Sequence, residues 1–168
     1  AGKNMSWNQL RLNLNNLARK GALLDTAALA EKLRNPEAVQ RAKVLPFSLY
    51  NTVKHLDAMV PMALANAMND ALEISSLNAP ALPGKTLVLV DSSGSMNSSA
   101  TGYRDGATST MRCVDAAGYF AISLLKANPD STTVIPFDTS VRTVRLNPRD
   151  SVATLVKSLP TMGGGTDI

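Results

Sequence analysis

The sequence predicts an α-helical segment followed by the first part of an α/β fold. In residues 1–77, apolar residues recur at spacings of three, four and seven, which is typical of amphipathic helices, and no strand candidate separates them. From residue 86 to residue 168, short β-branched and apolar runs alternate with helical stretches, which is typical of a parallel sheet. Residues 78–85 hold alanine, proline and glycine. We therefore expect a linker there, between two domains.

In the first domain, Ser6 is the expected N-cap of the first helix, and Asp25 is expected to start the second helix after a break at Gly21. Further helical stretches are expected over 37–43, 46–55 and 58–72. Because helix follows helix, the natural arrangement is a stack of helix pairs.

The second domain is expected to be a Rossmann-like half-sheet with three strands. Residues 86–90, Thr-Leu-Val-Leu-Val, are typical of a buried parallel strand. A Ser-, Thr- and Gly-rich loop is then expected. The later elements are a helix over 114–125, a hairpin of two strands over 132–137 and 141–146, and a helix over 152–159.

Composition excludes several function classes. The 168 residues carry a net charge of +4, with one cysteine and one histidine, so an intrachain disulfide, a cysteine-based zinc site and a His-rich metal site are all excluded. No apolar run approaches the ~18 residues of a membrane span, and the first residues lack a signal-peptide core. We expect a cytoplasmic protein without a membrane partner. No general base or activated nucleophile pair is visible, so an enzyme is not expected.

A candidate cation site follows the first predicted strand. Asp91, Ser93 and Ser95 alternate around Gly94, so a tight loop can aim three oxygens at one point, at the sheet edge where ligands of α/β folds bind. Oxygen donors suit a hard divalent cation such as Mg²⁺. The glycines of the 163–165 run permit a close turn, and Thr166 after them offers a fourth oxygen.

This pattern resembles the metal-ion-dependent adhesion site of von Willebrand factor type A domains. Asp91, Ser93 and Ser95 match its first motif, Thr166 matches its second-loop threonine, and Asp167 follows that threonine as in the family's GGTD run. The resemblance implies a divalent cation, most simply Mg²⁺, that attracts a protein ligand through an acidic group. The family's third motif, an Asp at the end of the fourth strand, is not among these residues. We therefore expect the 168 residues alone to bind cations weakly.

The helical segment resembles the closing HEAT-like helices of the TROVE module in the Ro ribonucleoprotein autoantigen family. The resemblance rests on the runs at 7–10, 15–21, 30–33 and 41–47, and in that family a ring of such helices precedes a type A domain. It implies binding of small structured noncoding RNAs, called Y RNAs, and of misfolded RNAs. Lysines and arginines supply the salt-dependent part of RNA affinity. The candidate phosphate contacts are Arg11, Arg19, Lys20, Arg34, Arg41 and Lys43.

Other interpretations stay open. The basic residues are equally compatible with ordinary solvated helix faces, and Trp7 and Phe47 are more typical of packing than of base stacking. The chain is also compatible with a metal-dependent protein-interaction module that does not bind RNA. In that case charge reversal at Arg41 and Lys43 leaves ligand binding unchanged, whereas Asp91→Ala abolishes it.

Overall fold

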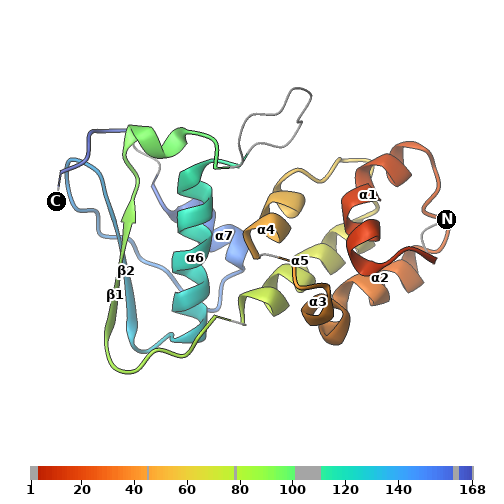
Figure 1. Ribbon diagram of the computed structural model, residues 1–168, viewed down its shortest axis with the longest axis horizontal. Coiled ribbons are helices and arrows are strands. Elements are labelled where there is room, and N and C mark those ends of the chain that lie inside the picture. Colours follow the sequence, from red (N-terminus) through yellow and green to blue (C-terminus); the bar gives the residue numbers. More distant parts are fainter. Residues whose placement is uncertain (1–3, 45, 78, 101–110, 161–162, 168) are drawn as a thin grey trace. The chain divides into compact units, whose positions relative to one another are not determined.

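The computed structural model describes residues 4–44, 46–77, 79–100, 111–160 and 163–167. The chain forms two compact units, Ala1–Ser75 and Ser76–Ile168. Figure 1 shows a helical unit and a unit that contains both strands. The α-helical and α/β character expected from the sequence is confirmed.

The helical unit consists of five helices in the described residues, and side-chain caps fix the starts of the first two of them. Ser6 caps α1 in a capping box with Gln9, because its hydroxyl accepts from the Gln9 N–H at 3.2 Å and the Gln9 side chain accepts from the Ser6 N–H at 2.8 Å. Asp25 caps α2 through the Ala28 N–H. The predicted caps at Ser6 and Asp25 are confirmed. The helices are α1 (Trp7–Arg19), α2 (Thr26–Arg34), α3 (Pro36–Ala42), α4 (Pro46–Lys54) and α5 (Met62–Ser76).

Leucines form much of the core of the helical unit, and Trp7 packs against them. Leu10, Leu33 and Leu64 are fully buried. Trp7 is 6% exposed and donates its indole N–H to the Leu33 carbonyl oxygen at 2.9 Å. Trp7 therefore packs between α1 and α2, in agreement with its predicted packing role and not with base stacking.

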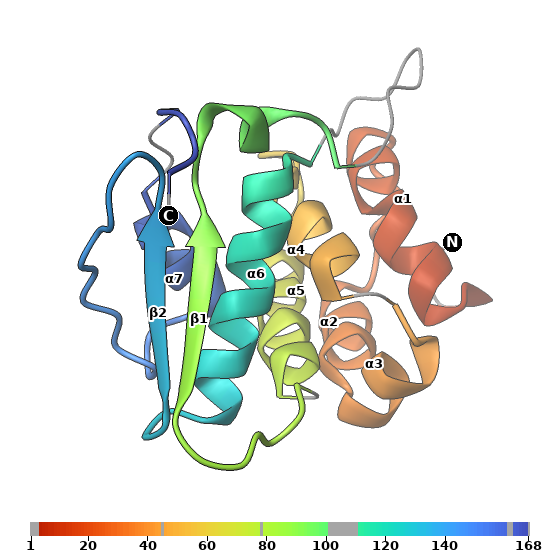
Figure 2. The same ribbon diagram turned by 60° about the vertical axis from the view of Figure 1, so that its left-hand side comes forward.

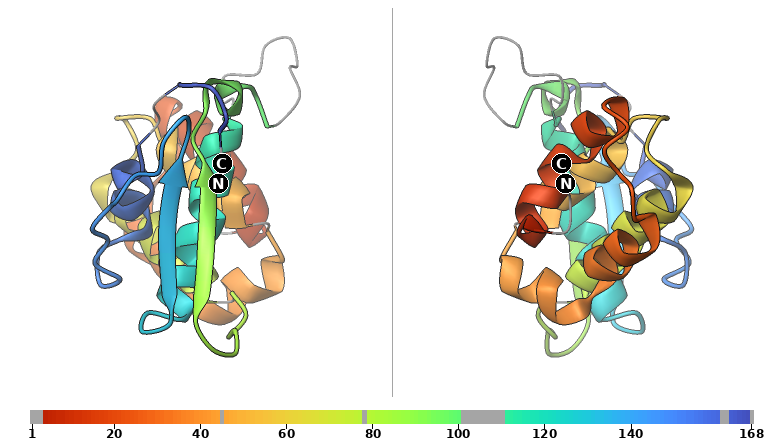
Figure 3. Two further views of the ribbon diagram at one scale, coloured as in Figure 1. Left: turned by 90° about the vertical axis from the view of Figure 1, so that its left-hand side faces the viewer. Right: turned by 90° about the vertical axis from the view of Figure 1, so that its right-hand side faces the viewer.

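The second unit is a two-stranded parallel sheet with helices on one face. Strand β1 (Thr86–Asp91) pairs with β2 (Thr132–Phe137), with Asp91 opposite Phe137. A short 3-10 helix η2 (Gly94–Asn97) follows β1, and α6 (Cys113–Ala127) and α7 (Val152–Ser158) complete the unit. Helix α6 packs against both strands, and α7 packs on α6 (Figures 2 and 3). Part of the expected loop after β1, residues 101–110, lies outside the described residues.

The third strand, predicted over residues 141–146, does not form. Residues 142–146 form no strand, and an isolated antiparallel bridge joins Phe137 to Val141. The Arg142 N–H donates to the Pro136 carbonyl oxygen at 2.9 Å, but Pro136 has no N–H with which to return a bond. Proline therefore removes a ladder donor at the free edge of β2, and pairing stops after one residue.

One face of the sheet carries exposed apolar side chains. Leu87 and Leu89 of β1 are 58% and 51% exposed, whereas Val90 is buried. Their alternation follows the two-residue period of a strand with one covered face. Within the part of the chain that the structure describes, no helix is long and apolar enough to cross a membrane.

Candidate cation site at the sheet edge

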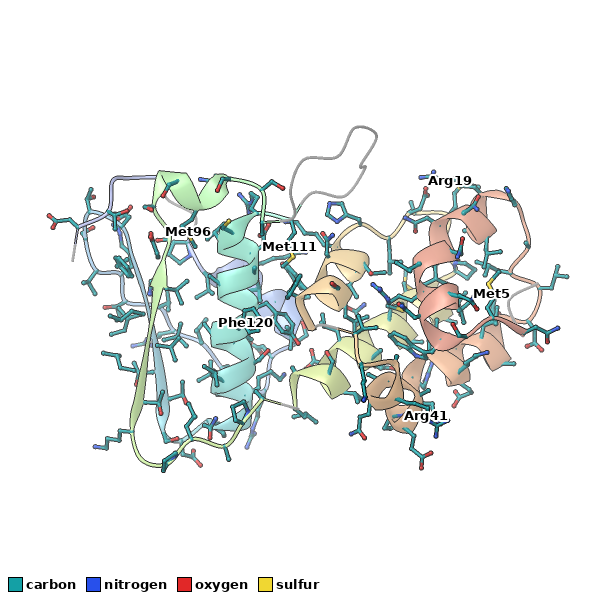
Figure 4. All side chains as sticks on the ribbon, viewed as in Figure 1. Met5, Arg19, Arg41, Met96, Met111 and Phe120 are labelled. Carbon is teal, nitrogen blue, oxygen red and sulfur yellow. The ribbon has the colours of Figure 1, made fainter. Side chains whose placement is uncertain are left out.

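The first half of the candidate site is the segment that follows β1. The Asp91 side chain is half-buried, and its Oδ1 accepts the Ser93 N–H at 2.8 Å. The hydroxyl oxygens of Ser93 and Ser95 lie 3.2 Å apart. Met96, labelled in Figure 4, marks η2 at this end of β1. The turn therefore brings the two serine hydroxyls together, directly beyond the carboxylate that ends the strand.

The second half of the candidate site is held against the first by backbone bonds. The Gly94 N–H donates to the Gly164 carbonyl oxygen at 2.8 Å, and the Gly163 N–H donates to the Ser92 carbonyl oxygen at 3.3 Å. A Cβ atom on Gly94 would lie 3.0 Å from the Gly163 carbonyl oxygen. Glycine favours this approach, because a side chain there would press on the backbone of Gly163. Figure 2 shows the two segments at the same end of the sheet.

Thr166 lies within this second segment. Its side chain is exposed. Two residues before Thr166, the Gly164 carbonyl oxygen accepts the Gly94 N–H. One residue after Thr166, the Asp167 N–H donates to the Asp138 carbonyl oxygen at 2.9 Å. The Thr166 backbone is thus fixed on both sides, at the edge where Asp91, Ser93 and Ser95 lie. Its role as a fourth oxygen ligand stays a prediction.

Sequence reasoning missed Asp138, which it assigned to the hairpin turn. Asp138 directly follows β2 and is 2% exposed. The Ser92 N–H and hydroxyl both donate to the carbonyl oxygen of the preceding Phe137 at 2.8 Å, so the ends of the two strands are tied together. Asp138 could have been recognised from its place in the sequence, because it follows the second parallel strand, whose end lies at the same edge of the sheet as the end of the first.

The donor set suits a hard cation. A carboxylate and hydroxyl oxygens are the ligand types that Mg²⁺ prefers. Within the described ranges, no three His, Cys, Asp or Glu side chains gather as a conventional metal cluster. Oδ2 of Asp91 accepts no hydrogen bond from a described residue. A site built here would therefore depend on Asp91 and on neutral hydroxyls.

Arg11 was predicted to contact RNA phosphates, but the structure buries it. Its side chain is 7% exposed. Nε and Nη2 donate to the Asn8 side-chain oxygen at 3.1 and 2.8 Å, and Nη1 donates to the Ser48 carbonyl oxygen and the Thr52 hydroxyl. Burial lowers the pKa of the guanidinium. Arg11 therefore joins α1 to α4 inside the unit and does not present its charge to a ligand.

Asn15 and Arg19, further along α1, also make contacts within the helical unit. Asn15 donates to the His55 carbonyl oxygen and accepts the Asp57 N–H, both at 2.9 Å. Arg19 lies 2.7 Å from Asp57 Oδ2. The Met59 N–H, and then Arg19, hold the pKa of Asp57 below its ordinary value. Arg19 is thus engaged in fastening the segment between α4 and α5.

The remaining predicted RNA contacts differ in their ion pairing and in their exposure. Arg34 is ion-paired, with its Nε 3.6 Å from Glu31 and 3.8 Å from Asp70. Arg41 projects from α3 (Figure 4) and lies 3.9 Å from Glu37, both side chains being more than 80% exposed. Lys20 and Lys43 are exposed at the C-terminal ends of α1 and α3. The structure does not bring these four into one cluster around a ligand.

The fold and the site define a helical unit followed by an α/β unit with a hydroxyl-rich loop at the carboxyl edge of its sheet. The crystal structure of the Ro (RSR) protein of Deinococcus radiodurans is similar, with a TM-score of 0.64 and 22% identity. The match covers 97% of this chain and 34% of that chain, so this chain spans about a third of that protein's length. No protein-family model and no curated protein sequence matches. The similarity establishes a Ro-like fold.

Proposed function

We propose that this chain is part of an RNA-binding ribonucleoprotein component that carries a divalent-cation adhesion site. The observation that carries the proposal is the likeness to the Ro (RSR) structure, which covers 97% of the chain and so extends over both units. The runs that resemble the TROVE module lie in the helical unit, and those that resemble a type A domain lie in the other. The proposed ligands are small structured or misfolded noncoding RNAs.

In the cation part of the proposal, Asp91, Ser93, Ser95 and Thr166 hold Mg²⁺. Because only one of these four ligands is charged, the bound dication keeps a net positive charge. It therefore attracts an acidic group of a protein ligand. The site binds and does not catalyse, since Asp91 is committed to the cation.

In the RNA part of the proposal, Lys20, Arg41 and Lys43 are the phosphate contacts. Their side chains are exposed and sit at or near helix ends. Arg34 contributes less, because two carboxylates already share its charge. Arg11 contributes nothing directly. Phosphate contacts of this kind position an RNA and make its affinity depend on salt, without specifying sequence.

A second candidate function is a metal-dependent protein-interaction module without RNA binding. The engagement of basic side chains within the helical unit favours it. Arg11 bonds inside the unit, Arg19 pairs with Asp57, and Arg34 pairs with Glu31 and Asp70.

Filter binding of a small structured RNA at several salt concentrations separates the two candidates. With RNA binding, affinity falls as salt rises, and the Arg41→Glu/Lys43→Glu variant flattens the log–log slope by about one unit per lost contact. Asp91→Ala serves as the matched control, because it removes the cation site and leaves the basic residues. Salt-dependent binding that Asp91→Ala keeps and the double variant weakens supports RNA binding. Absence of salt-dependent binding in the wild-type protein overturns it.

A further inference from the structure

Asp138 is a buried carboxylate next to the candidate cation site. It is 2% exposed and follows Phe137, the residue that pairs with Asp91. The two carboxylates therefore come at the ends of adjacent parallel strands, at the same edge of the sheet. Burying an ionised carboxylate is costly unless hydrogen bonds or a cation compensate it.

The described partners of Asp138 compensate its charge incompletely. Its Oδ1 accepts the Ser140 N–H at 3.1 Å and lies 3.4 Å from the Ser140 hydroxyl. Arg142 Nη2 lies 3.7 Å from the same oxygen, in an ion pair that offsets part of the charge. Among the described residues, Oδ2 of Asp138 therefore has no protein donor.

That oxygen faces the segment that completes the site. A Cβ atom on Gly164 would lie 3.0 Å from Asp138 Oδ2. The carbonyl oxygen of Gly164 accepts the Gly94 N–H at 2.8 Å, between Ser93 and Ser95 of the first motif. Oδ2 of Asp138 therefore lies against the glycine segment that bridges to the two serines.

We propose that Asp138 is a positioning residue for the cation, and that it acts by supplying a second negative charge beside Asp91. This inference rests on the proposed cation site. Asp138 does not contact the ion in this role, but its buried charge favours a dication held by Asp91 and neutral hydroxyls, because charges interact more strongly where water is excluded. The bound ion in turn compensates the buried carboxylate.

The test is Mn²⁺ binding to the full chain, followed by calorimetry, in the Asp138→Asn variant. This change keeps the shape of the side chain and removes its charge. The expected result is a loss of Mn²⁺ affinity on the order of tenfold, with a metal-free unfolding midpoint that is unchanged or higher. The control is Asp130→Asn, an exposed residue just before β2 that changes net charge equally. It is expected to keep wild-type affinity.

The other outcomes are distinguishable. Wild-type Mn²⁺ affinity in Asp138→Asn, with a lower metal-free unfolding midpoint, overturns the inference in favour of a purely structural role and leaves the cation site standing. Equal losses in the Asp138 and Asp130 variants overturn it in favour of a general net-charge effect. A wild-type chain that binds no Mn²⁺ overturns both the inference and the proposed cation site.

Discussion

The backbone N–H of Gly94 and the backbone carbonyl oxygen of Gly164 are joined by a 2.8 Å hydrogen bond. This bond links the segment after β1 to the segment that carries Thr166. It is made between backbone atoms of two glycines, and a Cβ atom on Gly94 would come within 3.0 Å of the Gly163 carbonyl oxygen. The two halves of the candidate site are therefore assembled by the chain itself.

Gly94→Ala is expected to destabilise the α/β unit. The added Cβ would meet the Gly163 carbonyl oxygen at 3.0 Å, so the backbone there would have to shift. Overpacking of this kind typically costs about 1–3 kcal/mol of unfolding free energy. Urea unfolding measures the loss.

Gly165→Ala is the matched control for that prediction. Its Cβ would lie 3.5 Å from the Thr139 methyl group, an ordinary van der Waals contact. We expect its unfolding free energy to stay within about 0.5 kcal/mol of wild type. Equal losses in the two variants would mean that the close approach at Gly94 is not what holds the segments together.

Arg11→Ala is expected to lower the unfolding free energy of the helical unit by about 1–3 kcal/mol, because it removes buried stem packing and the hydrogen bonds to α4. Arg11→Met should recover most of the loss. In that variant the Ser48 carbonyl oxygen keeps a donor, because the Thr52 hydroxyl also donates to it at 3.0 Å. Chemical denaturation of both variants, beside the exposed Arg41→Ala, measures this. A larger loss in Arg41→Ala than in Arg11→Ala would contradict the internal role of Arg11.

Asp57 makes the stability of the helical unit depend on acid pH. Its pKa is lowered in the folded protein by the Met59 N–H and Arg19, so the unfolded chain takes up the proton first as pH falls. The stabilisation by the ionised carboxylate is fully present above its ordinary pKa of 3.8, and it is lost as pH falls through the lower folded value.

The measurement for Asp57 compares thermal unfolding of wild type and Asp57→Asn from neutral pH to well below 3.8. The wild-type advantage should be constant at neutral pH and should disappear at the acid end. High salt should reduce it, because Arg19 is exposed. An advantage that persists unchanged at the acid end would show that the carboxylate charge has no part in it.

Local signals made much of the fold predictable. Ser6 and Asp25 could be identified as caps because their hydrogen bonds involve residues only three positions away. The strand at 132–137 could be identified from its own apolar run. The absence of a strand over 142–146 could not, because it depends on which edge of β2 the missing Pro136 N–H would face.

Long-range contacts explain two features that the sequence left open, the burial of Arg11 and the position of Asp138. Arg11 has the pattern of a surface arginine, and its burial results from Ser48 and Thr52 on another helix. The position of Asp138 in the candidate site emerges once the 163–165 glycines lie against it. The alternation of Asp91, Ser93 and Ser95, by contrast, is a local pattern and could be found directly.

The most direct test of the central claim, a divalent-cation site at the ends of β1 and β2, is paramagnetic broadening of amide signals by Mn²⁺ in the folded full chain. Broadening is expected at Ser93, Ser95 and Gly164 and not at Ser131, which precedes β2 at the opposite end of the same sheet. Asp91→Ala should abolish it while leaving the remaining spectrum folded. Absence of broadening at these amides in wild type, or broadening that Asp91→Ala leaves unchanged, would contradict the account.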